Sequence, residues 1–357
     1  MDVLSDVLRV VRLSGALFFT AELSAPWALE SPDPALLATV LPNAECLALF
    51  HVLVDGECWV DTAGHPTVHL HSGDVIIYPH SHPHIMRSAP GVRSVPINKV
   101  LPTGSGDQLL QLSYGGGGNK SRFLCGYLGC DQRFAPLVGA LPTMLLVRSR
   151  NGSTSVEAVR RGGKKPADVR QSGGTWLSTT LGYTIHEAAS FRPGNAAMLG
   201  RLTEIMFLDI VREYMQQLPP GETGWLAGLQ DPQVGKALRL MHAEPARRWT
   251  VEQIAREAGT SRSALAELFT ELLGEAPMHY LARWRIHLAR QLLCEPAGSI
   301  PEIATKVGYE SEAAFSRAFK RLVGTPPAAW RRAAAKDPRP QAILGPRLST
   351  SKRAAAR

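Results

Sequence analysis

The sequence predicts an α+β protein in which an N-terminal antiparallel β-barrel is followed by helices and then by an all-α domain with two helix-turn-helix motifs. Three observations predict this fold class. Strand-length apolar runs separated by Gly or Pro fill residues 46–127, and the apolar spacing becomes helical after Trp176. A capped helix, a Gly turn and a second capped helix then occur twice between Trp249 and Trp330.

The β-rich part begins with residues 1–22, which we expect to form a short helix running into an extended segment. Asp55-Gly56 is a hairpin signal between two of the later strands. Gly and Pro punctuation between short strands is typical of a small barrel or a double-sheet jelly roll. The predicted strands are Leu47–Val54, Glu57–Val60, Val68–His71, Val75–Tyr78 and Arg122–Leu128.

The predicted domain organisation has five parts, which fits a length of 357 residues. A Gly-, Ser-, Lys- and Arg-rich stretch marks a flexible insertion or linker, and an Ala-, Arg- and Pro-rich end marks a disordered basic tail. In the connector, the apolar residues of one helix face are expected to be buried, namely Met198, Leu202, Ile205, Met206 and Ile210. The parts are the barrel (1–149), the linker (150–174), a helical connector (175–232), the helix-turn-helix domain (233–332) and the tail (333–357).

Positive charge is concentrated at the C-terminal end. Residues 236–357 carry 21 Lys and Arg against 11 Asp and Glu, a net charge of +10, whereas residues 1–235 carry 18 against 20. This asymmetry indicates a polyanionic partner for the helix-turn-helix segment, with a solvated basic surface as the alternative. No secretory signal and no apolar run of membrane-spanning length is visible, so we expect a cytoplasmic protein without a membrane partner.

The first helix-turn-helix copy has a capping box at Thr250 and Gln253, a turn at Gly259 and a second cap at Ser261. Its second helix turns four side chains outward, where a recognition helix meets bases and phosphates. These candidate DNA-binding residues are Arg262, Ser263, Ala266 and Glu267.

The second copy repeats this arrangement with Ser299 and Glu302, then Gly308, then Ser311. Its outward residues are Glu312, Ala313, Ser316, Arg317 and Lys320, and the fork of Arg317 suits O6 and N7 of guanine. A continuous helix between the copies, from Pro277 to Cys294, is expected to fix their separation. The alternative interpretation is an ordinary helical bundle, since many tri-helical cores share one such pattern.

The C-terminal stretch resembles the DNA-binding domain of AraC/XylS-type regulators over about 95 residues. The resemblance implies that both recognition helices contact DNA. Ala266-Glu267 stands where many members place Arg, so the second helix is expected to read bases more than the first. The matching motifs are Trp249–Ala255, Ser261–Leu265, Gly274–Arg285, Val307–Ser311, Ala314–Arg321 and Gly324–Pro326.

The N-terminal part resembles the cupin-type ligand-binding domain that precedes this unit in one branch of the family. The resemblance implies a transcription regulator that binds double-stranded promoter DNA, acts with RNA polymerase, senses a small-molecule or redox signal and needs no cofactor. It also implies a homodimer formed through helices between residues 176 and 217. The matching pieces are Phe50–Trp59, Gly73–Pro79 with His84, Gly115–Gly118, Leu124–Gly126, Leu141-Pro142 and Gly224–Pro232.

Histidines and cysteines in the barrel are the candidate sensing groups. We single out His51 and His84, together with Cys125 and Cys130, where a thiol in the branch's Cys-Gly context suggests redox sensing. Seven histidines, namely His51, His65, His69, His71, His80, His82 and His84, are interpreted as surface or packing residues, and no metal is predicted.

A metal site is the alternative interpretation of these histidines. His69 and His71 point to one face of a strand, but the acid after them is Asp74, in a turn. The alternative function is therefore a cupin metalloenzyme whose helical end serves only assembly.

Overall fold

The structure is a computed structural model that describes residues 13–32, 46–101, 110–130, 135–150, 153–159, 175–189, 192, 194–219, 221–294 and 298–336. The chain divides into two compact units, and each is described by itself. One is the β-rich unit with its two covering helices. The other contains residues 135–140 and the helices after residue 218. No helix among these residues is long and apolar enough to cross a membrane.

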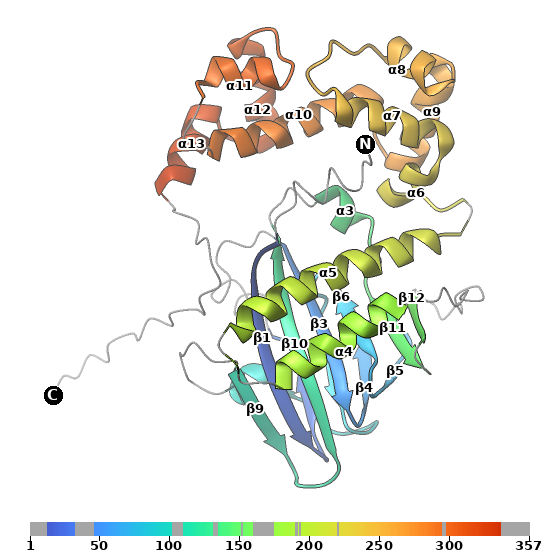
Figure 1. Cartoon of the computed structure of the whole chain (residues 1–357), viewed down its shortest axis with the longest axis vertical. Coiled ribbons are helices and arrows are strands. Elements are labelled where there is room, and N and C mark those ends of the chain that lie inside the picture. Colours follow the sequence, from blue (N-terminus) through green and yellow to red (C-terminus); the bar gives the residue numbers. More distant parts are fainter. Residues whose placement is uncertain are drawn as a thin grey trace, which may run out of the picture. The chain divides into compact units, whose positions relative to one another are not determined.

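The β-rich unit consists of two facing sheets (Figure 1). The seven-stranded sheet has the order β12-β11-β6-β3-β10-β1-β9, and the five-stranded sheet has the order β5-β4-β7-β2-β8. The strands are β1 (Leu13–Ser24), β2 (Ala28–Glu30), β3 (Cys46–Asp55), β4 (Glu57–Thr62), β5 (Val68–His71), β6 (Val75–Tyr78), β7 (His84–Arg87), β8 (Val95–Pro96), β9 (Leu110–Gly115), β10 (Lys120–Cys130), β11 (Leu145–Arg150) and β12 (Ser153–Ala158), with a 3₁₀ turn η1 (Ile97–Lys99) after β8.

An apolar core fills the space between the two sheets. It joins Leu49 of β3 and Phe123 of β10 to Leu70 of β5 and Met86 of β7. The opposite face of the large sheet is also buried, because Phe50 and Leu128 meet Phe207 of a covering helix. A strand buried on both faces is apolar throughout, which explains the unbroken run in β3.

The two facing sheets match the double-sheet form of the expected fold, but two of their strand pairings are parallel. β1 pairs in parallel with β9, and β2 pairs in parallel with β8. The expected extended segment near the N-terminus is β1, whereas the helix predicted before it lies outside the described residues. The other predicted strands form within two residues of their expected ends, and two of them, Val68–His71 and Val75–Tyr78, match at both ends.

Helices α4 (Thr175–Ala189) and α5 (Asn195–Gln216) lie side by side across the seven-stranded sheet (Figure 1). Met206 and Ile210 of α5 are buried, as expected. The expected burial of Met198 and Ile205 is wrong, since their side chains are 50% and 43% exposed. The buried stripe of α5 instead includes Leu199, Thr203 and Phe207.

Two predicted boundaries differ from the structure. β12 occupies the start of the segment expected to be a linker, because Val147 and Val156 face each other in its pairing with β11. The last helix runs to Lys336, four residues into the expected tail, since the alanines after Arg332 favour continuation of a helix. The remainder of both segments lies outside the described residues.

The helical unit contains both predicted helix-turn-helix motifs. α10 makes contacts with helices of both motifs. Its guanidinium group at Arg285 donates from Nε to the carbonyl of Pro245 (2.7 Å) and from Nη2 to that of Arg247 (2.7 Å). The helices are α3 (Ala135–Gly139), α6 (Trp225–Gln230), α7 (Pro232–Ala243), α8 (Val251–Ala258), α9 (Arg262–Leu273), α10 (Pro277–Cys294), α11 (Ile300–Lys306), α12 (Glu312–Val323) and α13 (Pro327–Lys336).

The two turn glycines have the same backbone conformation in different surroundings. Gly259 and Gly308 have φ values of +82° and +86°, which are unfavourable for other residues. A Cβ on Gly259 would meet nothing within 4 Å, whereas a Cβ on Gly308 would lie 2.7 Å from Cα of Ala246. The second turn is therefore packed against the backbone of the loop that precedes α8.

Replacing these two glycines by alanine separates the conformational cost from the packing cost. We expect Gly259→Ala to lower the free energy of unfolding by about 1–2 kcal/mol, the cost of a left-handed alanine. Gly308→Ala adds a backbone clash and is expected to cost at least ~1 kcal/mol more. Urea denaturation of both variants measures the difference, and equal losses would contradict the close packing of the second turn.

Candidate nucleic-acid interface and sensing cavity

The first helix-turn-helix is formed by α8 and α9. The side chain of Thr250 accepts from Gln253 N, and Oε1 of Gln253 accepts from Thr250 N. Ser261 caps α9 by accepting from Ala264 N. These caps satisfy the amide groups that a helix start leaves unpaired. Leu265 and Phe269 are fully buried, which fixes the rotation of α9 about its axis.

The second motif, α11 and α12, is built in the same way. Ser299 and Glu302 form the capping box of α11, and Ser311 accepts from Ala314 N at the start of α12. Phe315 and Phe319 take the buried places of Leu265 and Phe269, which lie 50 positions earlier. The burial pattern is identical between residues 261–270 and 311–320, so each motif presents the same row of positions to solvent.

The predicted DNA-binding side chains all lie in this outward row. Seven are exposed, and Ala266 and Ser316, at equivalent places, are half-buried. The exposed ones are Arg262, Ser263, Glu267, Glu312, Ala313, Arg317 and Lys320. These residues thus lie on the side of each recognition helix that faces solvent. DNA contact by each of them is a prediction.

The charges of the two rows differ. Nη1 of Arg262 lies 2.8 Å from a carboxylate oxygen of Glu252, in the first turn of α8. Among the described residues, Arg317 and Lys320 have no ion-pair partner. The sequence analysis did not predict this role of Glu252. Its position as an acidic residue in the first turn of α8 is the sequence signal that could have indicated it. The second recognition helix therefore carries the available cationic groups.

Three of the four predicted sensing residues meet at a small cavity between the two sheets. Nδ1 of His51 lies 2.9 Å from Sγ of Cys125, and Nε2 of His51 lies 2.9 Å from Nε2 of His84. All three are buried, and the remaining lining is mainly apolar, including Phe123 and Met86. Cys130 belongs to β10, but its side chain lies outside the described residues.

The direction of this hydrogen-bond chain follows from its end. Nδ1 of His84 lies 2.9 Å from the carbonyl oxygen of His82, which only accepts, so His84 carries its proton on Nδ1. Nε2 of His84 then accepts from His51, and Nδ1 of His51 accepts from the Cys125 thiol.

Burial keeps every member of this chain uncharged. It lowers the pKa of His84 to about 4 and, together with His84, lowers the pKa of His51 well below its usual range. Burial also raises the pKa of the Cys125 thiol well above its usual range. The chain is therefore a neutral relay of donors and acceptors and not a thiolate–imidazolium pair.

One further polar group at the cavity was not predicted. The indole of Trp27 is 1% exposed and lines the cavity, and its Nε1 has no hydrogen-bond partner among the described residues. A buried N–H without an acceptor is unfavourable, so this donor suits a ligand atom or an ordered water. The local sequence carries no signal for it, because the site forms only when Trp27, just before β2, packs on Phe123 of β10.

The other predicted histidines are not part of this cavity. His69 and His71 of β5 point to one face of the strand, as expected, but that face is the outer one. Val68 and Leu70, which alternate with them, belong to the core. The histidine-rich region is therefore divided between the interior and the surface of the β-rich unit.

Comparisons with known proteins agree with both units. The cupin family model matches residues 2–161 and 167–216, and the model of a helix-turn-helix domain matches residues 254–333.

Among relatives, an AraC-like transcription regulator of Streptomyces lividans is 42% identical over 149 residues, which cover 42% of this chain and 49% of that protein. The HTH-type transcriptional regulator AlkR of Acinetobacter baylyi is 27% identical over 93% of this chain and 99% of its own length. An uncharacterized HTH-type transcriptional regulator of Haemophilus influenzae is 25% identical over the same shares.

The cupin match alone spans more than half of the chain, and the helix-turn-helix match covers the second motif and most of the first. The chain therefore belongs to the cupin family and is an AraC-type regulator, with an N-terminal cupin domain and a C-terminal helix-turn-helix DNA-binding domain.

Proposed function

We propose that this protein is a one-component transcription regulator, in which a signal received by the cupin domain changes how the C-terminal domain engages promoter DNA. The repeated row of exposed positions on α9 and α12 is the observation that carries this proposal. Two recognition helices on one helical unit suit successive major grooves of a duplex. RNA polymerase at the same promoters, in the bacterial cytoplasm, is the proposed partner of the bound regulator.

Enzymatic activity is not part of this proposal. The relatives matched over nearly their whole length are named as transcriptional regulators. Both ring nitrogens of His51 are used within the hydrogen-bond chain of the cavity, which leaves neither for a catalytic metal without breaking a bond.

Mapping of the promoters that the full chain occupies in cells is the direct test of the function. We expect discrete sites, and binding to them in vitro should weaken steeply as salt rises, because phosphate contacts release counterions. If the purified chain shows no salt-dependent binding to duplex DNA, the proposed function as a transcription regulator is wrong.

The second recognition helix is proposed as the reader of bases. Arg317 has no ion-pair partner among the described residues, so its guanidinium is available for a guanine edge. In the first helix Arg262 is shared with Glu252, and Glu267 occupies the place equivalent to Arg317. A carboxylate there repels phosphates, so α9 is proposed to contribute mainly orientation and backbone contacts.

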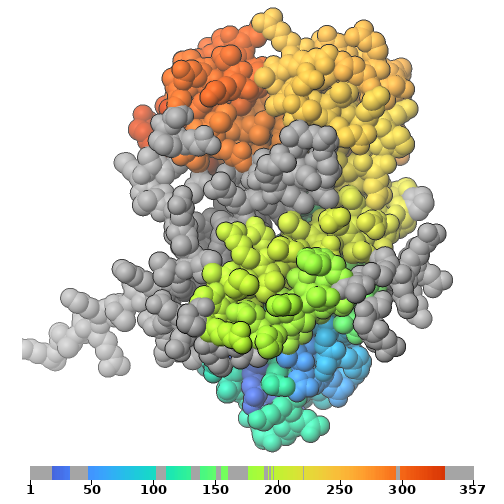
Figure 2. All heavy atoms as spheres, in the orientation of Figure 1, coloured from blue at the N-terminus to red at the C-terminus, as the bar shows by residue number. Residues whose placement is uncertain are grey.

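Dimerisation is proposed to use the outer side of α4 and α5, with a second copy of the chain as partner. Four large apolar side chains are exposed on these two helices: Trp176 (61%) and Tyr183 (63%) on α4, and Met198 (50%) and Ile205 (43%) on α5. Each pair is seven residues apart and so lies on one face of its helix. Figure 2 shows the two helices, in yellow-green, at the surface of the unit. Such an apolar surface suits a protein partner.

Signal reception is proposed to occur at the cavity beside His51, His84 and Cys125. A thiol whose pKa is raised by burial is a poor nucleophile, so direct oxidation of Cys125 is disfavoured. The unpartnered Trp27 N–H and the neutral relay instead suit a small, largely apolar effector that carries a hydrogen-bond acceptor. We therefore favour a small-molecule signal over a redox signal at this site.

Arg317→Ala is expected to weaken binding to a specific operator by about 1–3 kcal/mol and to relax selectivity at one base pair. The matched control is Glu267→Ala, which removes a carboxylate at the equivalent place and should not weaken binding. Gel-shift titrations against operators with single base-pair changes measure both effects. Unchanged selectivity in Arg317→Ala would refute its role as a base reader.

Ile205→Asp combined with Tyr183→Asp is expected to raise the dimer dissociation constant at least tenfold, which corresponds to about 1.4 kcal/mol. Both substitutions place a charge in the proposed apolar interface, and sedimentation velocity measures the result. Ala63→Asp, at an exposed turn between β4 and β5, is the control and should leave the association unchanged. A dimer that survives the double variant would place the interface elsewhere.

The thiol of Cys125 is expected to react with iodoacetamide at least about tenfold more slowly than that of exposed Cys294 in the native protein. The physical reason is that burial leaves Cys125 with little thiolate. Peptide mass spectrometry at timed intervals measures both rates in one sample. Comparable rates would show an accessible thiolate and would restore the redox signal.

A further inference from the structure

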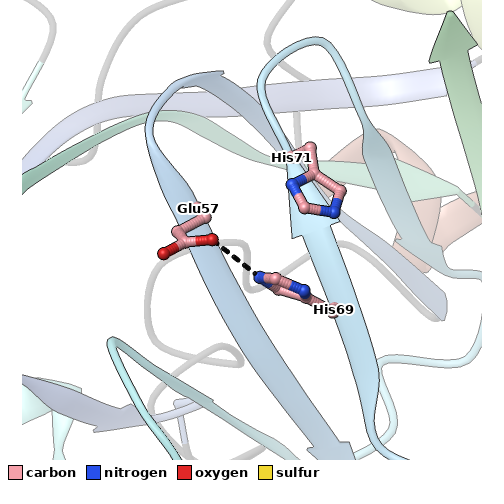
Figure 3. Close-up of side chains that lie close together, drawn as sticks. All are labelled: Glu57, His69 and His71. Atoms are coloured by element: carbon pink, nitrogen blue, oxygen red, sulfur yellow. Dashed lines mark hydrogen bonds and ion pairs between the residues drawn. The ribbon is translucent and has the colours of Figure 1, made fainter.

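The outer face of the β4–β5 pair brings together three side chains that bind transition metals. The register places Glu57 opposite His71 and Trp59 opposite His69. Cys58 and Leu70, which alternate with them, are in the core between the sheets. Glu57, His69 and His71 therefore share the solvent side of the five-stranded sheet (Figure 3), away from the cavity between the sheets.

The three side chains are close enough to share one ion. One ligand atom from each lies within 4.8 Å of the others, and Nε2 of His69 lies 3.0 Å from Oε2 of Glu57. Ligand atoms around a tetrahedral zinc ion are about 3.4 Å apart, since the metal–ligand distances are about 2.0–2.2 Å. Small side-chain rotations thus convert the existing arrangement into a coordinating one.

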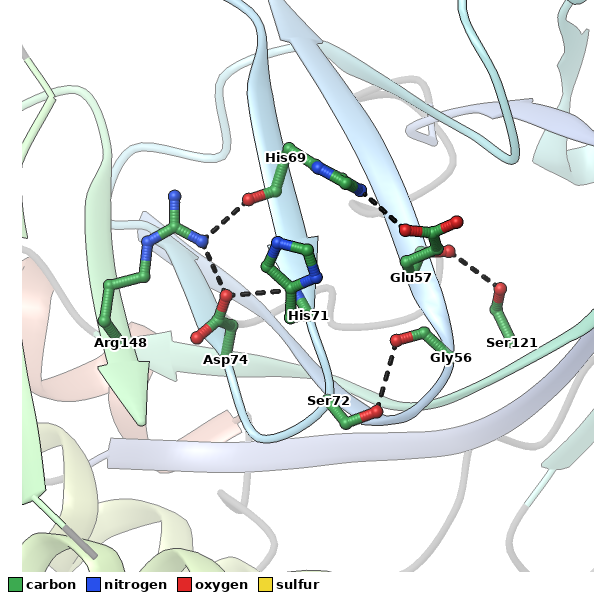
Figure 4. A network of polar contacts seen from close by, with 8 residues as sticks. All are labelled: Gly56, Glu57, His69, His71, Ser72, Asp74, Ser121 and Arg148. Carbon is green, nitrogen blue, oxygen red and sulfur yellow. Dashed lines mark hydrogen bonds and ion pairs between the residues drawn. The ribbon is translucent and has the colours of Figure 1, made fainter. Parts of the chain in front are cut away.

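The backbone beneath these side chains is held in place by a polar network (Figure 4). Asp74 accepts from the backbone N–H of His71 (3.0 Å), and Nη1 of Arg148 donates to the carbonyl of His69 (2.7 Å). The same guanidinium pairs with Asp74 at 2.6 Å, so its charge is compensated beside the site. Ser121 donates to the carbonyl of Glu57 at 2.9 Å. Each of the three ligand residues is therefore anchored through its main chain.

The ring of His69 is further held by an aromatic neighbour. Its plane stacks on Trp59, with centroids 3.9 Å apart and an angle of 13° between the planes. The ring of His71 lies 4.3 Å from that of His69. A stacked imidazole loses little freedom on binding, which favours coordination by this residue.

We propose that Glu57, His69 and His71 form a surface site for a divalent transition-metal ion of the Zn²⁺, Cu²⁺, Ni²⁺ or Co²⁺ class. Two imidazoles and one carboxylate suit these borderline ions, whereas Ca²⁺ and Mg²⁺ require sets of oxygen ligands. On binding, the ion takes the place of the proton on His69 Nε2, and the ring stays neutral by carrying its proton on Nδ1 instead. Three protein ligands leave a coordination position open to water or to an incoming group.

Isothermal titration of the metal-free full chain with Zn²⁺ tests the proposal. We expect a tight site with one ion per chain, and the single variants Glu57→Gln and His71→Gln should each weaken it by more than about 100-fold, beyond the usual effect of losing an outer contact. His65→Gln, at the half-buried turn of the same hairpin, is the matched control and should bind like the wild type. Binding that is unchanged by Glu57→Gln and His71→Gln, or absent in the wild type, would overturn the site.

A second measurement separates coordination from a change in folding. Cu²⁺ bound to the wild type is expected to show coupling to two imidazole nitrogens in its electron paramagnetic resonance spectrum, and His71→Gln should reduce this to one. The ligand side chains are at the surface, so far-UV circular dichroism of the variants should match that of the wild type. Because these readouts involve no DNA, loss of the metal site and loss of promoter binding are distinguishable. A spectrum without nitrogen coupling would contradict the assignment.

Discussion

One guanidinium group ties the DNA-binding unit together. Arg285 is on α10, and it donates to the carbonyls of Pro245 and Arg247 in the loop before α8. It also lies over the ring of Tyr309, 5.9 Å from the ring centre, in the turn of the second motif. Because Gly308 packs against Ala246 of the same loop, both motifs are fixed to one helix and to each other. The separation of α9 and α12 is therefore fixed within this unit, and the two helices present their exposed rows at a set distance from each other.

In the cupin domain, the polar groups at the cavity bond to one another inside an apolar core. This core admits the relay of Cys125, His51 and His84 because each donor in that relay meets an acceptor. The relay begins at the cavity and ends at the main chain of His82, just before β7. A ligand that competes for one of these hydrogen bonds would leave a donor or an acceptor of the relay without its partner, and the other bonds of the relay would have to rearrange. Local chemistry at the cavity is thereby connected to the position of a strand.

Local interactions made much of this structure predictable. The capping boxes at Thr250 and Ser299 and the turn glycines act within a few residues, so their pattern predicts both motifs. Non-local pairing was not predictable in the same way. The parallel strands, β12 and the orientation of Ile205 all depend on partners distant in the chain. The same holds for Glu57, whose place beside His69 and His71 follows from the hairpin register and not from the spacing of the histidines.

The unequal charges of the two recognition helices have a consequence for genome organisation. With Glu267 on one helix and Arg317 on the other, the two ends of a single bound chain are chemically distinct. An operator that fits one chain is thus asymmetric, and it need not be palindromic. Turning such an element around at a promoter presents the regulator to the transcription start in reverse. The effect on transcription then depends on the orientation of the DNA element as well as on its distance from the gene.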